Sequence, residues 1–309
     1  MIFGPEFPKS QDRLREGLYE LLRRSYERAE EKGQGLAVYR SSFQVLRALA
    51  EQPWAQPTIF PAESRLVRQF LAQTKLRPAD AGKLVSRSLL LHAAAATWRR
   101  TLQRMARAPF LSLCDVSGEE FLKDALAQGR GVMVLHRHTL FASLFWSWLE
   151  HAGYVPGVTL GHWAWAPGSR GAREDPKAWV PEVARELMGA AASLRAGGLA
   201  HVFADGIVGA RPIELEFCNR RRGFRPAFAE LALGTNSLML SAGVDMRADG
   251  RLAVRVEAPL ADDAALPRAE RGARLVREYA ARLRERWEED PAQLPWNDML
   301  NHLRFPALQ

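Results

Sequence analysis

The sequence predicts an α/β protein in which a central, mostly parallel sheet is flanked by helices and preceded by a helical N-terminal region. Apolar residues recur at helical spacing through the first hundred residues, and strands alternate with helices from Ser117 onward. The composition, 47% hydrophobic and 25% charged, is that of an ordinary folded protein. We expect a helical region over residues 1–115 and an α/β core over 116–309, together forming one compact unit.

The helical region is expected to begin with the repeat from Leu14 to Tyr26, which Gly33 stops. The following predicted helices are a stripe over 43–49, a stripe over 66–71 and a longer helix over 78–108. The first helix is amphipathic, so it can pack on its own core or lie on a membrane surface, and we favour the core.

The core is expected to open with a capping box, Ser117 and Glu120, ahead of a helix that Gly129 closes. The predicted strands are 131–135, 155–160, 199–204, 213–217, 237–244 and 252–257, and the predicted helices are 139–151, 179–196, 226–233 and 268–289. Strands alternating with helices indicate a mostly parallel sheet that is covered on both faces.

The net charge is +8, and the basic residues are almost all arginine, with 6 lysines among 43. The excess of arginine over lysine has two explanations. One is codon bias in a high-GC genome, and the other is a partner rich in phosphate or carboxylate, because arginine binds both. Composition does not choose among anionic lipid, a phosphopantetheine donor, an acidic carrier protein and nucleic acid. No nucleic-acid recognition motif is visible, and we expect no such partner.

Two cysteines, Cys114 and Cys218, exclude a disulfide scaffold and a cysteine-rich zinc module, and they predict a reducing, cytoplasmic environment. The most apolar run, 139–149, is too short to span a membrane. The first residues show no secretory signal pattern. A role at a membrane would therefore be peripheral, on the surface of the inner membrane.

Two predicted strands run into reactive side chains. The strand over 131–135 is followed by His136 and His138, and the strand over 199–204 by Asp205. Ligands of open α/β sheets bind beyond the carboxyl ends of the strands, where a histidine can act as a general base and an acid can fix its tautomer. The alternative is a pair of hydrogen-bonded turn residues. His136-x-His138 has no third spaced ligand, so we expect no metal.

The segment 129–153, GRGVMVLHRHTLFASLFWSWLEHAG, resembles the central motif of the bacterial lipid A biosynthesis acyltransferases, a strand followed by His-x-x-x-x-Asp/Glu. Similar elements follow at 202–206 (VFADG), 213–240 and 291–296 (PAQLPW), so the resemblance covers about 115–305. It implies transfer of a fatty acyl group from acyl-CoA or acyl-carrier protein to a hydroxyl or amine. It also implies that His138 is the general base, with no cofactor besides the donor.

The chain departs from the family pattern at Ser143, where the family has its acid, and it lacks the family's N-terminal anchor helix. Three interpretations stay open. The acid comes from elsewhere, with Asp205 as the candidate; the acceptor needs less activation; or catalysis is lost and the chain is an inactive homologue that binds acyl chains or carrier proteins. His136 is the candidate substitute for His138.

The resemblance also implies an arginine about thirty residues after the acid, which corresponds to Arg173 with Arg170 close by. Such an arginine stabilises an oxyanion or grips a phosphate, unless it is a solvated loop residue. A second arginine cluster predicts an anionic partner, such as the donor phosphates or an acidic headgroup, or else a basic exposed turn. Its members are Arg220, Arg221, Arg222 and Arg225.

Overall fold

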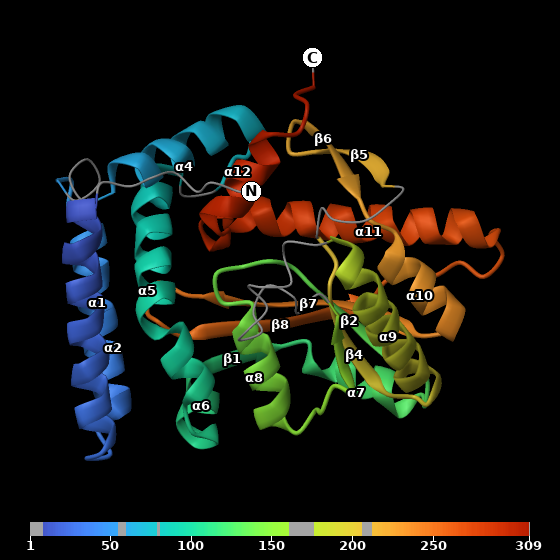
Figure 1. The fold of residues 1–309 in the computed structure, drawn as a ribbon, viewed down its shortest axis with the longest axis horizontal. Coiled ribbons are helices and arrows are strands. Elements are labelled where there is room, and N and C mark those ends of the chain that lie inside the picture. Colours follow the sequence, from blue (N-terminus) through green and yellow to red (C-terminus); the bar gives the residue numbers. More distant parts are fainter. Residues whose placement is uncertain (1–8, 55–59, 79–80, 161–175, 206–211, 309) are drawn as a thin grey trace.

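The computed structural model describes residues 9–54, 60–78, 81–160, 176–205 and 212–308, and its elements are labelled in Figure 1. The helices are α1 (Lys9–Glu30), α2 (Gly35–Ala50), α4 (Pro61–Thr74), α5 (Leu84–Arg104), α6 (Arg107–Leu113), α7 (Glu119–Ala127), α8 (Ser143–Ala152), α9 (Pro176–Arg195), α10 (Ala227–Thr235), α11 (Arg268–Glu289) and α12 (Trp296–Leu303), with short 3-10 turns at Ala81–Lys83 and Pro291–Gln293. The strands are β1 (Cys114–Ser117), β2 (Val132–His136), β3 (Val158–Leu160), β4 (Leu199–Phe203), β5 (Ile213–Phe217), β6 (Arg220–Phe224), β7 (Leu238–Met246) and β8 (Leu252–Pro259). The predicted α/β fold with a helical N-terminal region is confirmed.

The central sheet has the strand order β1-β8-β7-β2-β4-β3, and only the β7–β8 pairing is antiparallel. Strand β2 lies between β4 and β7 and is buried along its whole length. Its apolar residues explain this position, because a central parallel strand is covered on both faces. His136 at its end pairs with Phe203 at the end of β4, so these two strands end at the same level of the sheet.

Helices cover both faces of this sheet. Phe145 of α8 packs against the ring of His136, and Ala242 of β7 pairs with His136 on that face. Ser241 of β7 lines a cavity together with Tyr279 of α11. Figure 1 shows α11 on one side of β7 and β8, with α8 on the other.

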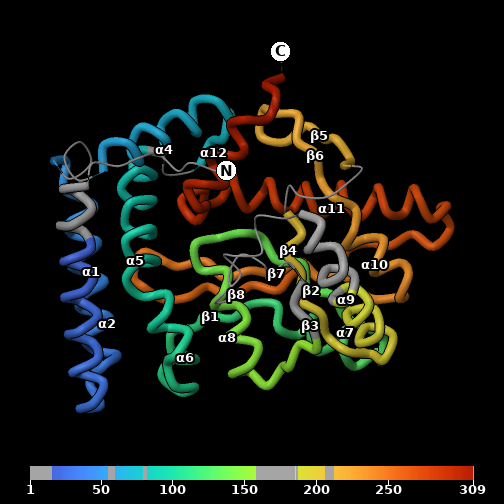
Figure 2. The backbone as a smooth tube through the Cα atoms, viewed as in Figure 1, coloured from blue at the N-terminus to red at the C-terminus, as the bar shows by residue number. Residues whose placement is uncertain are grey.

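The N-terminal helices pack against the end of the chain. Helix α4 lies on α12, and α5 contacts the turn Pro291–Gln293. Helices α1 and α2 form a hairpin at one edge of the molecule (Figures 1 and 2), and the Tyr39 hydroxyl of α2 donates to the carbonyl of Gly250 between β7 and β8 (2.7 Å). The division of the chain at residues 115 and 116 stays a prediction.

Two local expectations are wrong. The predicted helix over 78–108 is divided, with α5 ending before Met105 and α6 starting at Arg107. The cause is Pro109, whose ring would clash with the carbonyl of Met105 in a continuous helix. The predicted capping box is absent, because Ser117 is the last residue of β1 and its hydroxyl reaches the carbonyl of Val254 at 3.5 Å.

The arginine cluster folds as a hairpin of β5 and β6, which was not predicted as two paired strands. Its two-residue turn, Cys218 and Asn219, has positive φ at both positions (46° and 60°), as a tight hairpin turn requires. The last described residues pair with the hairpin, since the backbone N–H of Arg221 donates to the carbonyl of Pro306 (2.9 Å). Figure 1 shows this C-terminal segment beside β6.

Within the described ranges, no helix combines the length and the apolar character that a membrane-crossing segment needs.

Candidate active site

His138 and Asp205 meet at the carboxyl-end edge of the sheet. Each lies two residues past a pair of matched strand ends, since His136 of β2 pairs with Phe203 of β4. The Nδ1 atom of His138 lies 2.6 Å from Oδ1 of Asp205, and the backbone N–H of His138 donates to Oδ2 at 2.8 Å. Both carboxylate oxygens therefore bind the same residue, and this fixes the acid relative to the ring. The sequence-based pairing of these two residues agrees with this geometry.

The two groups form a charged pair. Burial lowers the pKa of His138, but the charge and the hydrogen bond of Asp205 outweigh burial and raise it to about 9. Burial raises the pKa of Asp205, but the charge and the hydrogen bond of His138 lower it to about 2. Because a carboxylate accepts at Nδ1, that nitrogen carries a proton, and Nε2 is the atom left for chemistry. The His138 side chain keeps 31% of its surface exposed, whereas that of Asp205 keeps 5%.

Three further residues surround the pair. The ring of Phe203 stacks on that of His138, with centroids 4.7 Å apart. Arg222 of β6 donates from Nη2 to the main-chain carbonyl of Asp205 (2.7 Å). Asp298, in the first turn of α12, is the third charged residue that acts on His138, besides Asp205 and Arg222. Burial raises its pKa to about 6, although the positive charges of His138 and Arg222 act in the other direction.

Sequence analysis missed the place of Asp298 and the role of Arg222. The available signal for Asp298 was its position two residues after Trp296, the end of the PAQLPW element. An acidic residue shortly after a proline such as Pro295 is also typical of the first turn of a helix. Nothing local pointed from Asp298 to His138, because the two residues are 160 positions apart in the chain.

His136 lies in a different environment. It is fully buried, and its Nδ1 atom lies 2.6 Å from the carbonyl oxygen of Arg137. Burial and the neighbouring ring of His201 lower its pKa well below the usual range. Its ring packs between aromatic side chains, including Phe145 and Phe203. These surroundings do not favour His136 as the substitute base.

Ser143 does not take the place of an acid beside His138. It is the first residue of α8, and its Oγ atom is buried without a hydrogen-bond partner. No hydrogen bond joins Ser143 to His138 among the described contacts, whereas the carboxylate of Asp205 contacts the His138 ring directly.

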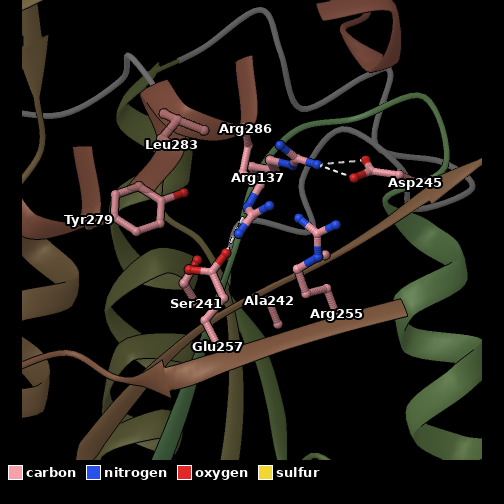
Figure 3. A pocket seen from close by; sticks show the side chains of 10 residues that line it. Arg137, Ser241, Ala242, Asp245, Arg255, Glu257, Tyr279, Leu283 and Arg286 are labelled. Carbon is pink, nitrogen blue, oxygen red and sulfur yellow. Dashed lines mark hydrogen bonds and ion pairs between the residues drawn. The ribbon is translucent and has the colours of Figure 1, made fainter. Parts of the chain in front are cut away.

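Arg137, between the two histidines, points away from the pair. Its Nη2 atom lies 2.6 and 2.5 Å from the two carboxylate oxygens of Asp245. Figure 3 shows this ion pair at a polar cavity that Tyr279 and Glu257 also line. The cavity volume of about 20 Å³ suits a single water molecule. We assign Arg137 a structural role between β7 and α11.

The predicted arginines have different surroundings. Arg170 and Arg173 lie outside the described residues. Arg220 is buried and donates to the carbonyl of Phe305 (3.0 Å) and to the side chain of Gln73. Arg222 is buried as described above, so the cluster is not the uniformly exposed basic turn that was one expectation. Arg221 is exposed and Arg225 is partly buried on the same hairpin.

Two open cavities of about 480 and 660 Å³ lie beside α12. They share the stacked rings of His92 and Trp296, whose centroids are 3.8 Å apart. The smaller one includes Leu140, two residues after His138, and three alanines of α5, namely Ala93, Ala95 and Ala96. The larger one includes Leu66 and Leu300. The walls of both cavities are largely apolar, and the smaller cavity reaches the segment that follows His138 through Leu140.

No group of three or more potential metal-ligating side chains occurs within the described part of the chain. In comparisons with known proteins, no family model and no curated protein matches this sequence.

Proposed function

We propose that the protein is an acyltransferase that moves a fatty acyl group from an acyl thioester, on coenzyme A or a carrier protein, to a hydroxyl or amine acceptor. The observation that carries the proposal is the bond of 2.6 Å between His138 Nδ1 and Asp205 Oδ1 at the carboxyl ends of β2 and β4. It supports an oriented general base in the position where α/β proteins bind ligands.

In this proposal, Nε2 of His138 takes the proton of the acceptor while the acceptor oxygen or nitrogen attacks the thioester carbonyl carbon. The tetrahedral intermediate collapses with cleavage of the C–S bond, and the leaving thiolate recovers the proton from the imidazolium. Asp205 stays ionised throughout and stabilises the charged ring. The apolar cavities beside α12 suit the acyl chain, since binding sites for such groups are concave and mostly apolar.

The raised pKa of His138 predicts an alkaline activity profile. A general base works in its neutral form, and a ring with a pKa of about 9 is mostly protonated at pH 7. We expect kcat/KM to rise with pH, to be half-maximal near pH 9 and to level off above it.

The second candidate is an inactive homologue that binds acyl chains or carrier proteins. Ser143 favours it, because the serine stands where the family has its acid. For either candidate we propose that the protein is cytoplasmic. Where it associates with a membrane, we propose that it binds peripherally to the inner membrane. The net charge of +8 supports contact with an anionic lipid surface or an acidic carrier protein.

The test is acceptor-dependent release of free thiol. Purified protein is mixed with acyl-CoA or acyl-carrier protein and a panel of hydroxyl and amine acceptors, and the acylated product is identified by mass spectrometry. His138→Ala should reduce transfer by about 10²-fold or more. His151→Ala is the control, since His151 lies in α8 against Phe110, away from the pair. Donor binding without thiol release would favour the inactive homologue, and neither binding nor release would refute both.

A further inference from the structure

Arg222 is a cation held inside the protein. Its residue surface is only 6% exposed, although β6 belongs to a small two-stranded sheet near the surface. Four aromatic rings surround it, with centroids 5.1 to 5.9 Å from the guanidinium carbon, and these belong to Phe217, Phe224, Trp287 and Phe305. Such rings attract a cation through their electron-rich faces. The side chain is therefore unsuited to gripping a substrate phosphate in solvent, and its contacts point to a different role.

The one hydrogen bond recorded for the Arg222 side chain among the described residues goes to the candidate site. Nη2 donates to the main-chain carbonyl of Asp205 at 2.7 Å. The carboxylate of Asp205 points the other way, toward the ring and the backbone N–H of His138. Asp205 lies two residues past the end of β4, and the N–H of the preceding Ala204 still donates to the carbonyl of His136 (3.0 Å). The Arg222 bond thus fixes the backbone of the residue whose side chain orients the base.

Removing a charged side chain from water is costly, and a buried arginine needs compensation. Burial lowers the pKa of Arg222, while the charges of Asp205 and Asp298 act in the other direction. The aromatic rings add a second compensation. A hairpin with no role beside Asp205 would not need a buried cation at this position.

We propose that Arg222 is a positioning residue, whose guanidinium holds the main chain of Asp205 so that the carboxylate keeps both of its hydrogen bonds to His138. The proposal deepens the proposed function and rests on it for its effect on turnover. Its effect on the His138–Asp205 pair does not depend on any activity.

The charged groups that face His138 come from three elements. Asp205 follows β4, Asp298 lies on α12 and Arg222 lies on β6. The two acids raise the pKa of His138, and the arginine lowers it. Loss of the arginine's charge alone would therefore raise the pKa of His138. Loss of a firmly held Asp205 carboxylate would lower it, because the main attraction that outweighs burial would weaken. The two effects have opposite signs, so a titration distinguishes them.

The experiment titrates His138 by NMR in protein labelled at histidine, with the resonance assigned from its absence in His138→Ala. Its pKa of about 9 separates it from the buried His92, whose pKa burial lowers to about 3, and from His302, at about 4. The variants are Arg222→Met, which keeps an apolar body for the aromatic cage, and Arg222→Lys, which keeps a charge without the planar fork. Arg222→Lys also serves if the methionine variant does not fold.

The matched control for the titration is Arg220→Met. Arg220 lies two residues away on the same strand, is about equally buried, and bonds to Phe305 and Gln73 instead of Asp205. It reproduces the loss of a buried arginine from β6 without touching the pair.

We expect Arg222→Met to lower the pKa of His138 by about one unit or more and to weaken the downfield proton signal of its Nδ1–H, whereas Arg220→Met leaves both in place. Arg222→Lys should fall between the wild type and Arg222→Met. Where transfer is detected, kcat should fall roughly tenfold with little change in KM, as expected for lost orientation.

Two results would overturn the proposal. A raised pKa of His138 would show that Arg222 acts through its charge alone, and an unchanged pKa would show that Arg222 only packs. If the wild type has no transferase activity, the titration still tests Arg222, and the proposed function alone fails.

Discussion

Replacing Asp205 with asparagine tests the central interaction of the candidate site. The change keeps the size of the side chain but removes the charge that holds the His138 ring in its protonated form. Asparagine also places an amide N–H where a carboxylate oxygen was, so it no longer fixes the proton on Nδ1. The same change in a catalytic triad lowers kcat by about 10⁴ because the base takes the wrong tautomer.

The magnitude of the electrostatic effect follows from the pKa of His138. A value of about 9, against an ordinary 6.5, represents about 3 kcal/mol of preference for the charged ring. Because burial opposes that preference, Asp205→Asn should bring the pKa of His138 back toward 6.5 or below. At pH 7 about one ring in a hundred is neutral in the wild type, whereas most are neutral in the variant. The variant therefore gains neutral base and still loses turnover, because orientation and charge stabilisation are lost.

The assay is the pH dependence of kcat/KM for acyl transfer, which reports the pKa of the free enzyme's base. The wild type should show an acid limb whose midpoint lies near pH 9. In Asp205→Asn the limb should move to about pH 6.5 and the plateau should fall by roughly 10⁴. Asp124→Asn, at an exposed position of α7, controls for the loss of one carboxylate. An Asp205→Asn profile that overlays the wild type would refute the oriented-base mechanism.

Three further outcomes follow from the same site. Ser143→Glu in the Asp205→Asn background should restore part of the turnover, measured by thiol release. The reason is that a carboxylate then stands at the position that it has in the resembled family. No gain would mean that the start of α8 does not face the His138 ring. Asp298→Asn should lower the pKa of His138 and move the acid limb to lower pH, since the charge of Asp298 raises that pKa. Urea unfolding at several pH values should show stability lost in two ranges. The contribution of His138, whose pKa is raised, is complete below 6.5 and lost as pH rises through about 9; that of Asp205, whose pKa is lowered, is present above 3.8 and lost as pH falls toward 2. His138→Ala should remove the alkaline loss, and an unchanged alkaline loss would count against the pair.

Much of the fold followed from periodic patterns in the chain. The predicted helix over 268–289 has the same bounds as α11, because its apolar residues recur at helical spacing between charged ones. Patterns that are short or strongly charged gave no such signal. Strand β1 is the four-residue segment CDVS, and β6 begins with three arginines, a composition that does not indicate a strand. The turn between β5 and β6 contains Cys218, a residue that is uncommon at positive φ, so the usual Asn-Gly or Asp-Gly signal for a hairpin was missing.

The candidate site divides in the same way. Sequence reasoning paired His138 with Asp205, because two parallel strands end at one edge of a sheet and each is followed by a reactive residue. It did not find Asp298 or the role of Arg222, because their positions depend on how α12 and the β5–β6 hairpin pack. Composition indicated an anionic partner for the arginine run, whereas Arg222 contacts a carbonyl and four aromatic rings of its own chain. A charge pattern does not reveal whether its partner is external or part of the same protein.

The balance of charge around His138 indicates what the site stabilises. With Asp205 and Asp298 ionised and Arg222 charged, electrostatic neutrality requires a protonated His138. In the proposed mechanism, His138 must first lose that proton, so the neutral base is scarce at neutral pH. When the neutral ring takes a proton from the acceptor, however, the charges of the four groups balance again. In the proposed reaction, the site is thus complementary to the imidazolium that forms as the bond to the acyl carbon is made. Measured from the deprotonated form of the site, which is the form that reacts, this stabilisation lowers the barrier of the transfer step.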